Sequence, residues 1–418
     1  MSFRRAKEAH PKRRKARRVL LVHRFYAPDV TTYSSMLAMI AHQLALDGFD
    51  VSVYTTQPSY NDVYDGPALP SKRIEDGVKV FRCSIPGGGT SLGRLLGGLL
   101  FGIRLVFHAL THRTKYDAIM VSTVPPVLMG QFGLMASLAA NAQLLYHCMD
   151  LYPEIAVASG NAPRGPISRI ATALDNATIS KSARTIVLSG DMERTIAARG
   201  SSTESVQVLN NFVIGSGDAV LAAEVPEQLK KSHRFRLLFA GNLGRFQRLR
   251  DLLEALAIDN DDNTELVFLG AGAAKTELEA MAKDLDLQER VLFVDHQPLE
   301  VAMHAMEQSD LAVVSLAPNL IGSAYPSKTL MYLEMGCRIL SVVEAGSALA
   351  ALIGDHDLGT TASPGNPDSI ARAIAEERSR KTDDSDRARA KLIAEKEFGS
   401  ATVLPQWTEI FRDITANT

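Results

Sequence analysis

The sequence predicts an α/β protein of two Rossmann-like domains that meet at a cleft, and three observations lead to this prediction. A chain of 418 residues with 46% hydrophobic content is too long for one ordinary core and implies roughly two domains. Apolar strands alternate with helical segments over residues 19–209, and a second series of this kind spans residues 236–343. Such alternation is typical of parallel sheets that helices cover on both faces.

The first series opens with a strand, a helix and a second strand. The apolar strand 19–22 leads into the loop 23–34, and apolar residues at helical spacing then predict a helix that ends at Gly48. The strand 51–54 completes a βαβ unit. Further strands are predicted at residues 78–82, 118–121, 143–148, 185–188 and 206–209. The polar stretch 215–233 has no apolar periodicity in its centre and is predicted to link the two domains.

The first eighteen residues are strongly basic. They carry nine Lys or Arg against Glu8, a net charge of +8, so the formal total of −2 leaves −10 on the remaining 400 residues. Residues 1–18 are therefore predicted to be a disordered basic arm. Such an arm binds an anionic membrane with about 1 kcal/mol per basic residue, or it is simply a solvated tail, and both readings stay open. Nucleic acid is not an expected partner, because no downstream segment interleaves basic residues with stacking aromatics.

Cysteine usage and the apolar segments predict where the protein acts. Three scattered cysteines suit a reducing compartment, and no apolar core follows the basic start as in a secretory signal. We therefore expect a cytoplasmic protein, with peripheral contact at the inner face of the membrane as a possibility. The apolar segment 95–107 is interrupted by Arg104 and is predicted to be a helix docked on its own sheet. A helix lying in the membrane interface has the same composition and remains the alternative.

Two stretches in the second series have the composition of phosphate-binding turns. In residues 236–247 an apolar strand runs into a glycine-containing turn and a basic residue. In residues 321–330 small residues lead into Pro-Ser-Lys at a predicted helix start, where backbone N–H groups, the helix dipole and Lys328 attract anions. Together the two stretches predict a site for a diphosphate.

Several residues are candidates for that site. Lys328 and Arg245 would face the phosphates and the Ser327 hydroxyl would donate to them, whereas Asp150 could be a helix N-cap. The other candidate ligand-binding residues are Gly241, Asn242, Gly244, Gln247, Gly270, Gly272, His296, Ser323, Ala324 and Tyr325. No Asp-x-Asp pair lies beside the predicted phosphate site, so no metal ligand is expected.

These motifs, in their order and spacing, resemble the family 4 glycosyltransferases, enzymes of GT-B fold that move a sugar from a nucleotide diphosphate to an acceptor. In the first half the resemblance is carried by residues 23–34, by Asp-Leu-Tyr-Pro-Glu at 150–154, and by residues 188–192 and 208–213. In the second half it is carried by residues 240–244 and 268–272 and by Pro-Ser-Lys at 326–328, which is typical of one subgroup.

The resemblance implies a hexosyl- or N-acetylhexosaminyltransferase of cell-surface polysaccharide or cell-wall synthesis. Its donor would be a nucleotide diphosphate sugar, with UDP as the expected nucleotide, and its acceptor a carbohydrate or lipid-linked hydroxyl. Transfer would retain the anomeric configuration without an obligatory metal or other cofactor. Acceptor contacts would come from Thr31, Thr32 and Tyr33, and Asp150 would orient the donor sugar or the acceptor hydroxyl. Residues 19–214 would form the acceptor domain, residues 234–398 the donor domain, and residues 399–418 a helix that returns to the first domain.

The sequence also departs from the family pattern. Many members carry two glutamates, and Ser323 and Met331 occupy those positions here, with Glu334 three positions late. Where many members have a histidine beside Asp150 this chain has Met149, and His147 is expected to be packed in the fold. Two other classes remain open: a nucleotide-sugar epimerase, which would isomerise the donor without an acceptor, and a donor-binding protein without catalysis.

Overall fold

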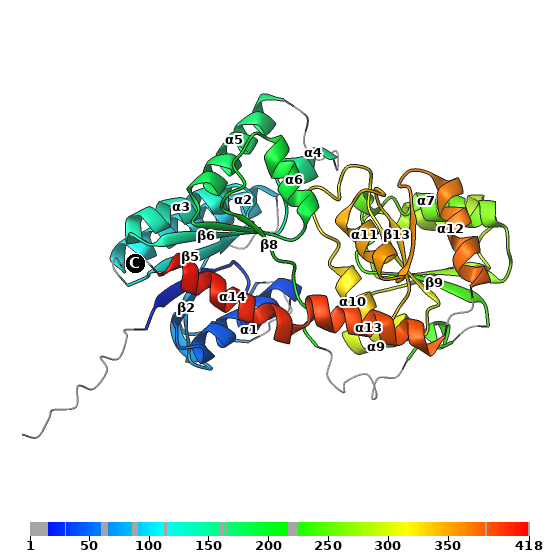
Figure 1. Cartoon of the computed structure of the whole chain (residues 1–418), viewed down its shortest axis with the longest axis horizontal. Coiled ribbons are helices and arrows are strands. Elements are labelled where there is room, and N and C mark those ends of the chain that lie inside the picture. Colours follow the sequence, from blue (N-terminus) through cyan, green and yellow to red (C-terminus); the bar gives the residue numbers. More distant parts are fainter. Residues whose placement is uncertain are drawn as a thin grey trace, which may run out of the picture.

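The computed structural model consists of two α/β domains side by side (Figure 1). It describes residues 16–29, 31–59, 66–85, 91–112, 115–158, 163, 165–215, 225–231, 233–380 and 383–416. The sequence-based prediction of two Rossmann-like domains is confirmed. Most of the predicted basic arm and the centre of the predicted linker lie outside the described residues. The first sheet uses residues 18–208 and the second residues 235–362, so we propose that the domain boundary lies between these sheets.

The first sheet has eight strands in the order β3-β4-β2-β1-β5-β6-β7-β8. They are β1 (Arg18–Val22), β2 (Asp50–Thr56), β3 (Lys72–Glu75), β4 (Val78–Cys83), β5 (Ala118–Ser122), β6 (Gln143–Cys148), β7 (Arg184–Val187) and β8 (Val206–Val208). Neighbours are parallel except β3 and β4, which are antiparallel. The sequence analysis missed β3, because its four residues are mostly exposed and carry no apolar run.

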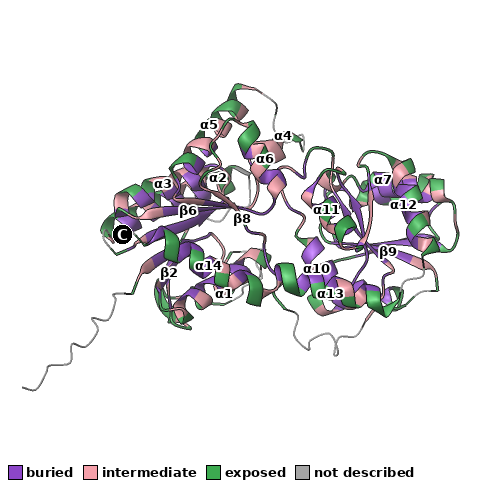
Figure 2. Cartoon of the chain, viewed as in Figure 1, coloured by how far each residue is buried: buried purple, intermediate pink, exposed green. Residues whose placement is uncertain are grey.

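Helices cover both faces of this sheet. They are α1 (Thr32–Leu46), α2 (Ser91–Thr111), α3 (Leu128–Ala140), α4 (Glu154–Ala158), α5 (Pro166–Lys181) and α6 (Gly190–Ala198). Side chains alternate along a strand, so Leu20 and Val22 pack with α2, α3 and α5, whereas Val19 and Leu21 pack with α1 on the opposite face. The central strands β1 and β5, which lie between these layers, are almost entirely buried (Figure 2).

The helix α2 is longer than the apolar segment that the sequence analysis considered. It runs through Arg104 without a break and packs against α3. In the described part of the chain it is also the helix whose length and composition would suffice to cross a membrane, at Leu92–Thr111. Its inner side, which includes Phe101, Leu105 and Ala109, is buried on the first domain. The sequence analysis predicted that this helix docks on its own sheet, and its inner side does so.

The second sheet has six parallel strands in the order β11-β10-β9-β12-β13-β14. They are β9 (Phe235–Ala240), β10 (Thr264–Leu269), β11 (Val291–Val294), β12 (Leu311–Ser315), β13 (Ile339–Val342) and β14 (Gly359–Ala362). The helices α7 (Arg250–Asp259), α8 (Lys275–Asp284) and α12 (Pro367–Ser379) cover one face. The helices α9 (Leu299–Glu307), α10 (Lys328–Glu334), α11 (Ala348–Asp355) and α13 (Asp384–Phe398) cover the other. Short 3-10 helices occur at η2 (Glu227–Leu229) and η3 (Arg245–Gln247).

The last helix, α14 (Ser400–Ile414), crosses back to the first domain, as predicted (Figure 1). Val403, Trp407, Ile410 and Phe411 are buried against α1 and the first sheet. Apolar residues at this spacing form one face of a helix, so the end of the chain ties the two domains together.

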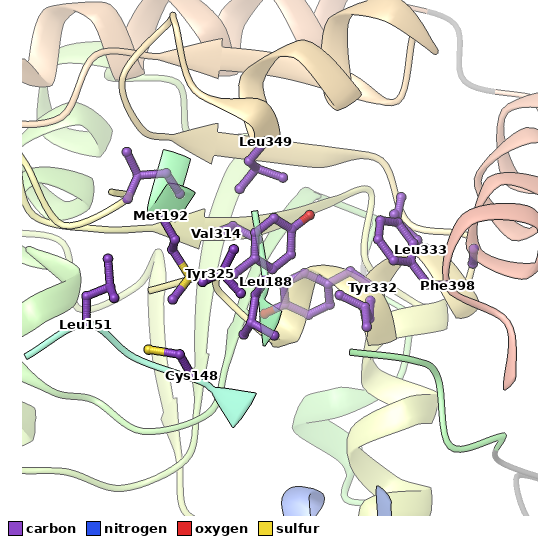
Figure 3. Packing of buried hydrophobic residues seen from close by; sticks show 14 of the residues in the cluster. Cys148, Leu151, Leu188, Met192, Val314, Tyr325, Tyr332, Leu333, Leu349 and Phe398 are labelled. Atoms are coloured by element: carbon purple, nitrogen blue, oxygen red, sulfur yellow. The ribbon is translucent and has the colours of Figure 1, made fainter. Parts of the chain in front are cut away.

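The two domains also touch beside the cleft. Asp150 and Ala324 form an isolated antiparallel bridge, and Leu151 N donates to Ser323 O at 2.7 Å. Figure 3 shows side chains of both domains in one buried cluster around this contact, among them Leu151 and Met192 from the first domain and Tyr325 and Leu349 from the second.

Candidate functional site

The two stretches that the sequence analysis singled out meet at one cavity of about 640 Å³. Its wall comes mainly from the second domain, and Thr32 at the start of α1 contributes from the first. Eight of the predicted site residues line it: Thr32, Gly241, Asn242, Gln247, Gly270, His296, Ser327 and Lys328. The turns that carry most of them follow β9, β10, β11 and β12, so the cavity lies at the carboxyl edge of the second sheet, where open α/β sheets bind ligands.

The Lys328 amine is buried against an aromatic ring. Its Nζ is buried, lies 3.3 Å from the centre of the Phe239 ring, and has no hydrogen-bond partner among the described residues. An ideal Cβ built at Gly241 would be 3.6 Å from this nitrogen, so the backbone of the first turn passes close to it. Burial lowers the pKa of Lys328 to about 7. A buried amine held without an acidic partner is prepared to receive an anion.

A hydrogen bond joins α10, the helix that begins at Lys328, to the second sheet. The Tyr332 hydroxyl accepts a 2.8 Å hydrogen bond from Ala240 N, which ties α10 to the end of β9. Because α10 has only seven residues, Lys328 itself supplies most of the positive charge at this position.

The glycines of the two turns are required by backbone packing. Gly270 has φ +142°, and a Cβ there would lie 2.1 Å from Gly241 O. A Cβ at Gly272 would lie 2.3 Å from Leu243 O. The turns after β9 and β10 therefore pack directly on each other. We expected Gly272 to let a nucleotide approach, but it lies beneath the neighbouring turn and does not line the cavity.

Two amide side chains meet over Gly244. A Cβ at Gly244 would lie 2.8 Å from both Asn242 Nδ2 and Gln247 Oε1, so only glycine leaves room for this pair. Gln247 Oε1 is buried and has no hydrogen-bond partner within the described part of the chain. Asn242 and Gln247 both line the cavity, so they offer amide donors and acceptors to a ligand there.

Arg245 was predicted to face the same phosphates as Lys328, but in this structure the two side chains line different cavities. The 3-10 turn η3 directs the exposed Arg245 into a separate cavity of about 460 Å³, which Arg248 also lines. Arg248 donates to both Asp251 oxygens at 2.8 Å. The Lys328 cavity includes neither arginine in its wall.

Asp150 stands where the first domain touches the second. It follows β6 directly, and its backbone bridges Ala324, four residues before Lys328. Burial raises the pKa of Asp150 to about 6. Asp150 does not belong to the wall of the cavity, but the bridge brings it to the loop that leads to Ser327 and Lys328.

A buried network holds the segment that contains Asp150. Arg199 Nε donates to Glu154 Oε1 at 2.7 Å, and Arg199 Nη2 donates to Tyr152 O at 3.1 Å. Arg199 Nη1 also donates to Asp175 Oδ2 at 2.6 Å, and the Tyr146 hydroxyl donates to Asp175 Oδ1 at 2.9 Å. Both side chains of the Arg199–Asp175 pair are at most 5% exposed. Charge-assisted hydrogen bonds from Arg199 thus hold the Asp-Leu-Tyr-Pro-Glu segment in place.

The loop 323–325 has a structural part in this contact. Ser323 is buried, and its carbonyl accepts from Leu151 N. Tyr325 is packed in the cluster between the domains, where burial raises its pKa and a hydrogen bond to Asn210 opposes that rise. Ser323, Ala324 and Tyr325 do not line the cavity. We expected them to contact the donor, and the structure instead places them in the interdomain contact.

The three predicted acceptor residues have different surroundings. The Thr31 side chain caps α1 by accepting from Ser34 N, and the exposed Thr32 lines the cavity. The Tyr33 hydroxyl lies 2.9 Å from His147 Nδ1. Burial lowers the pKa of His147 to about 3, so this imidazole is neutral.

His147 is the packed histidine that the sequence analysis expected. It is completely buried, and its ring lies edge-on to Trp407 of α14, with 4.8 Å between the ring centres. The first-domain side of the cleft is therefore connected to the returning helix.

The missing glutamates leave an apolar wall. Met331 lines the cavity, whereas Glu334 lies at a different pocket beside Lys391 and Gly399. Sequence reasoning did not single out several wall residues, namely Ala240, Leu269, Gln297, Leu299, Ala302 and Met306. Leu299, Ala302 and Met306 share one helical face, which in a sequence is indistinguishable from a face that packs in the core. Within the described residues no group of three or more His, Cys, Asp or Glu could hold a metal ion.

Comparison with known proteins agrees with this geometry. Residues 31–211 match the glycosyl transferase 4-like domain, and residues 222–394 match the glycosyl transferases group 1 domain. Over 294 residues the chain is 26% identical to a probable glycosyltransferase, WbjE, of Pseudomonas aeruginosa, which covers 68% of this chain and 71% of that protein. Over 340 residues it is 23% identical to WcaI of Escherichia coli K12, a putative colanic acid biosynthesis glycosyl transferase, which covers 78% of this chain and 83% of that protein.

The fold is also that of solved structures. The Anabaena protein HepE in complex with UDP superimposes with a TM-score of 0.66 at 19% identity, covering 95% of this chain and all of that chain. The two domain matches together span the chain from the first helix to α13, in the order in which the two sheets occur. The chain therefore belongs to the family 4 glycosyltransferases of GT-B fold.

Proposed function

We propose that this glycosyltransferase moves a hexosyl or N-acetylhexosaminyl group from a UDP-sugar to the hydroxyl of a lipid-linked or envelope glycan acceptor. The WbjE and WcaI resemblance, and the second protein's description in colanic acid biosynthesis, support a role in bacterial cell-surface polysaccharide synthesis. The complex of HepE with UDP supports the nucleotide. We assign the chain to the Pro-Ser-Lys subgroup on residues 326–328 and place its activity on the cytoplasmic side of the membrane.

The observation that carries this proposal is the buried amine of Lys328, which has no hydrogen-bond partner among the described residues, in the wall of the 640 Å³ cavity. When the bond between the anomeric carbon and the diphosphate breaks, negative charge collects on the leaving group, and the anomeric centre becomes oxocarbenium-like. Lys328 is placed to hold that charge, together with the Ser327 hydroxyl and the backbone of Gly241. Because the Lys328 amine is itself buried, its charge acts there more strongly than it would in water.

The other roles follow from position. Asn242 and Gln247 would bind the sugar or the phosphates, and His296 would contact the base edge. Asp150, from the first domain, would orient the reacting hydroxyl, with Thr32 on the acceptor side of the cavity. We also propose that transfer retains the anomeric configuration and requires no metal, since Lys328 provides the charge that a metal would otherwise supply. EDTA treatment should then leave the rate unchanged.

A two-step experiment tests the proposal. A thermal-shift screen of nucleotide sugars should identify the donor, because a ligand at a hundred times its dissociation constant stabilises by about 2.7 kcal/mol. The donor is then incubated with the protein, alone and with membrane glycolipid extract. Transfer only in the presence of extract supports the proposal. An isomerised sugar from donor alone would show an epimerase, and binding without any conversion would show a donor-binding protein.

A further inference from the structure

The outward side of α2 is apolar along its whole length. Leu92, Leu96, Ile103, Phe107 and Leu110 are each between 53% and 66% exposed. Their spacing of three, four and seven residues places them in one stripe, opposite the buried Phe101, Leu105 and Ala109. A helix that only covers its own sheet has a polar outer side, so this stripe needs another explanation.

The apolar surface continues onto two neighbouring helices. The helix α3 packs between α2 and α5, and all three lie on the same face of the first sheet (Figures 1 and 2). Met135 and Leu138 are exposed on α3, and Ile167, Ile170 and Leu174 are exposed on α5. Among the described residues, eleven of the eighteen exposed large hydrophobic side chains lie on these three helices. Single exposed apolar residues are ordinary, but a gathering of this kind marks an interaction surface.

The charges on these helices have one sign. The exposed charged residues of α2, α3 and α5 are Arg94, Arg104, Arg169 and Lys181. Their one acidic residue, Asp175, is buried in the ion pair with Arg199. The surface is therefore complementary to negative charge. A second copy docked here through the same face would bring like charges together, which opposes self-association.

The surface reaches the cleft at the beginning of α2. A Cβ at Gly98 would lie 2.8 Å from Pro125 Cγ, in the loop that follows β5. Arg94 is close enough to Arg24 to lower the pKa of that side chain, an effect that adds to the larger effect of burial. Arg24 lies in the loop after β1 that leads to Thr32 in the cavity wall. The beginning of α2 thus lies near the loop that leads to Thr32 in the cavity wall.

We propose that α2, α3 and α5 form a docking surface for an anionic lipid bilayer, with the apolar stripe of α2 in the interface and the four basic residues at the headgroups. The apolar outer side and the basic residues together meet the requirements of an interfacial helix. The inner side of α2 stays packed on its sheet, so the helix lies on the bilayer and does not cross it. The docking surface is argued independently of the proposed function. Only its purpose, which is to bring the cleft to a lipid-linked acceptor, rests on that function.

The test measures co-sedimentation of the full chain with phosphatidylcholine vesicles that contain or lack phosphatidylglycerol, without donor or acceptor. The double variant Ile103→Ser with Phe107→Ser should bind the anionic vesicles about tenfold or more weakly. The matched control is Leu46→Ser with Leu392→Ser, which changes two leucines of similar exposure on α1 and α13 and should bind normally. Arg94→Gln and Arg104→Gln should each weaken binding to anionic vesicles by roughly fivefold.

Four results would overturn the proposal. They are normal binding by the Ile103/Phe107 variant, equal loss in the Leu46/Leu392 control, complete loss on removing residues 1–15 alone, and retention of the protein on vesicles after alkaline carbonate washing. An unchanged melting temperature without any ligand verifies that the variants are folded. If sedimentation velocity shows that the wild-type chain is a dimer and that the Ile103/Phe107 variant is a monomer with normal vesicle binding, the surface serves a second copy. Because no transfer is measured, the vesicle-binding result can be interpreted even if the proposed activity is wrong.

Discussion

Lys328 combines two properties that oppose each other in the empty protein. Its amine is buried without a partner in the described structure, which costs stability, yet that placement is what a departing diphosphate needs. Lys328→Met should lower the transfer rate by about a hundredfold or more, the effect of removing one donor from a developing oxyanion. The measurement is kcat with a saturating donor, with Lys283→Met on the exposed side of α8 as control. A variant with nearly normal rate would exclude Lys328 from the leaving-group site.

The same residue gives a pH-dependent prediction for stability. The pKa of Lys328 is about 7 in the folded chain and 10.5 in its ordinary state, so between these values the unfolded chain binds more protons. The free energy of unfolding should therefore rise as pH rises from about 7 towards 10.5. Chemical denaturation at several pH values should show that Lys328→Met stabilises the protein most below pH 7 and progressively less above it. A stability gain that is equal at all pH values would contradict this assignment.

Asp150 should show the corresponding behaviour of a buried acid. Its pKa is about 6 in the fold and 3.8 ordinarily, so between these values the folded chain binds more protons and stability falls as pH rises. Asp150→Asn should then be more stable than the wild type above pH 6 and equal to it below about pH 3.8. Its transfer rate should fall about a hundredfold while UDP affinity stays unchanged, because orientation and not donor binding is lost. Full activity in this variant would make Asp150 a purely structural residue.

At the scale of single residues, the sequence indicated which side chains have suitable chemistry more reliably than where those side chains point. Lys328, Gly241 and Gln247 could be recognised because small residues and a strand end in a fixed order bring them to one place. Arg245 belonged to the same pattern, yet the 3-10 turn η3 points it into the next cavity. Gly270 and Gly272 were read as ligand contacts, but the approach of one turn to another already requires them. That approach depends on the spacing of β9 and β10, which no local pattern records.

At the scale of elements, the segment 150–154 depends on one arginine of the helix α6 region. Arg199→Met would leave Asp175 buried without its charge partner and release Glu154, and such a loss costs about 3–5 kcal/mol. Denaturation followed by Trp407 fluorescence measures this cost, since Trp407 is the chain's one tryptophan. Adding Asp175→Asn should recover part of it, because Tyr146 can still donate to the amide oxygen.

The matched control for Arg199 is an exposed pair. Lys230→Met breaks the ion pair between Lys230 and Glu227, whose side chains are 55% and 83% exposed respectively. This change should lower the free energy of unfolding by less than about 1 kcal/mol. If Arg199→Met costs equally little, the network does not hold the Asp150 segment.

The elements themselves were largely predictable, and the exceptions have physical causes. Buried parallel strands are apolar runs, so β1, β2, β5 and β6 were visible in the sequence. The edge strand β3 was not, because pairing on one side leaves its side chains exposed. The outer side of α2 could not be told from its inner side either. Both are apolar, and only the packing of Phe101 and Leu105 shows which of them faces the sheet.

At the scale of the whole molecule, the two domains are held together at both ends of the cleft. The helix α14 buries Trp407 and Phe411 on the first domain, as the family resemblance implied for residues 399–418. The contact at the other end was not predictable, because it joins residues far apart in the chain. Asp191 Oδ2 accepts from Ala348 N at 2.9 Å, so an acid of α6 caps the start of α11 in the other domain. Relative domain position thus depends on small groups in loops.

Gly322 gives the sharpest test of that dependence. A Cβ at Gly322 would lie 2.7 Å from Thr195 Oγ1 on α6, so Gly322→Val should force the domains apart beside the Asp150–Ala324 bridge. Transfer should fall at least tenfold, because a misplacement of about 1 Å can cost a hundredfold in rate, whereas UDP binding should persist. Small-angle scattering should show a larger radius of gyration.

Two further variants decide whether the clash is the cause. Gly346→Val, on the other loop that faces α6, has nothing within 4 Å of its Cβ position and should be nearly normal. Thr195→Ala removes the hydroxyl that Gly322→Val would strike, so the double variant should recover most of the lost rate. If Gly322→Val is fully active, or if Thr195→Ala gives no recovery, the activity does not depend on the domain contact that this structure shows, and transfer must occur in another arrangement of the two domains.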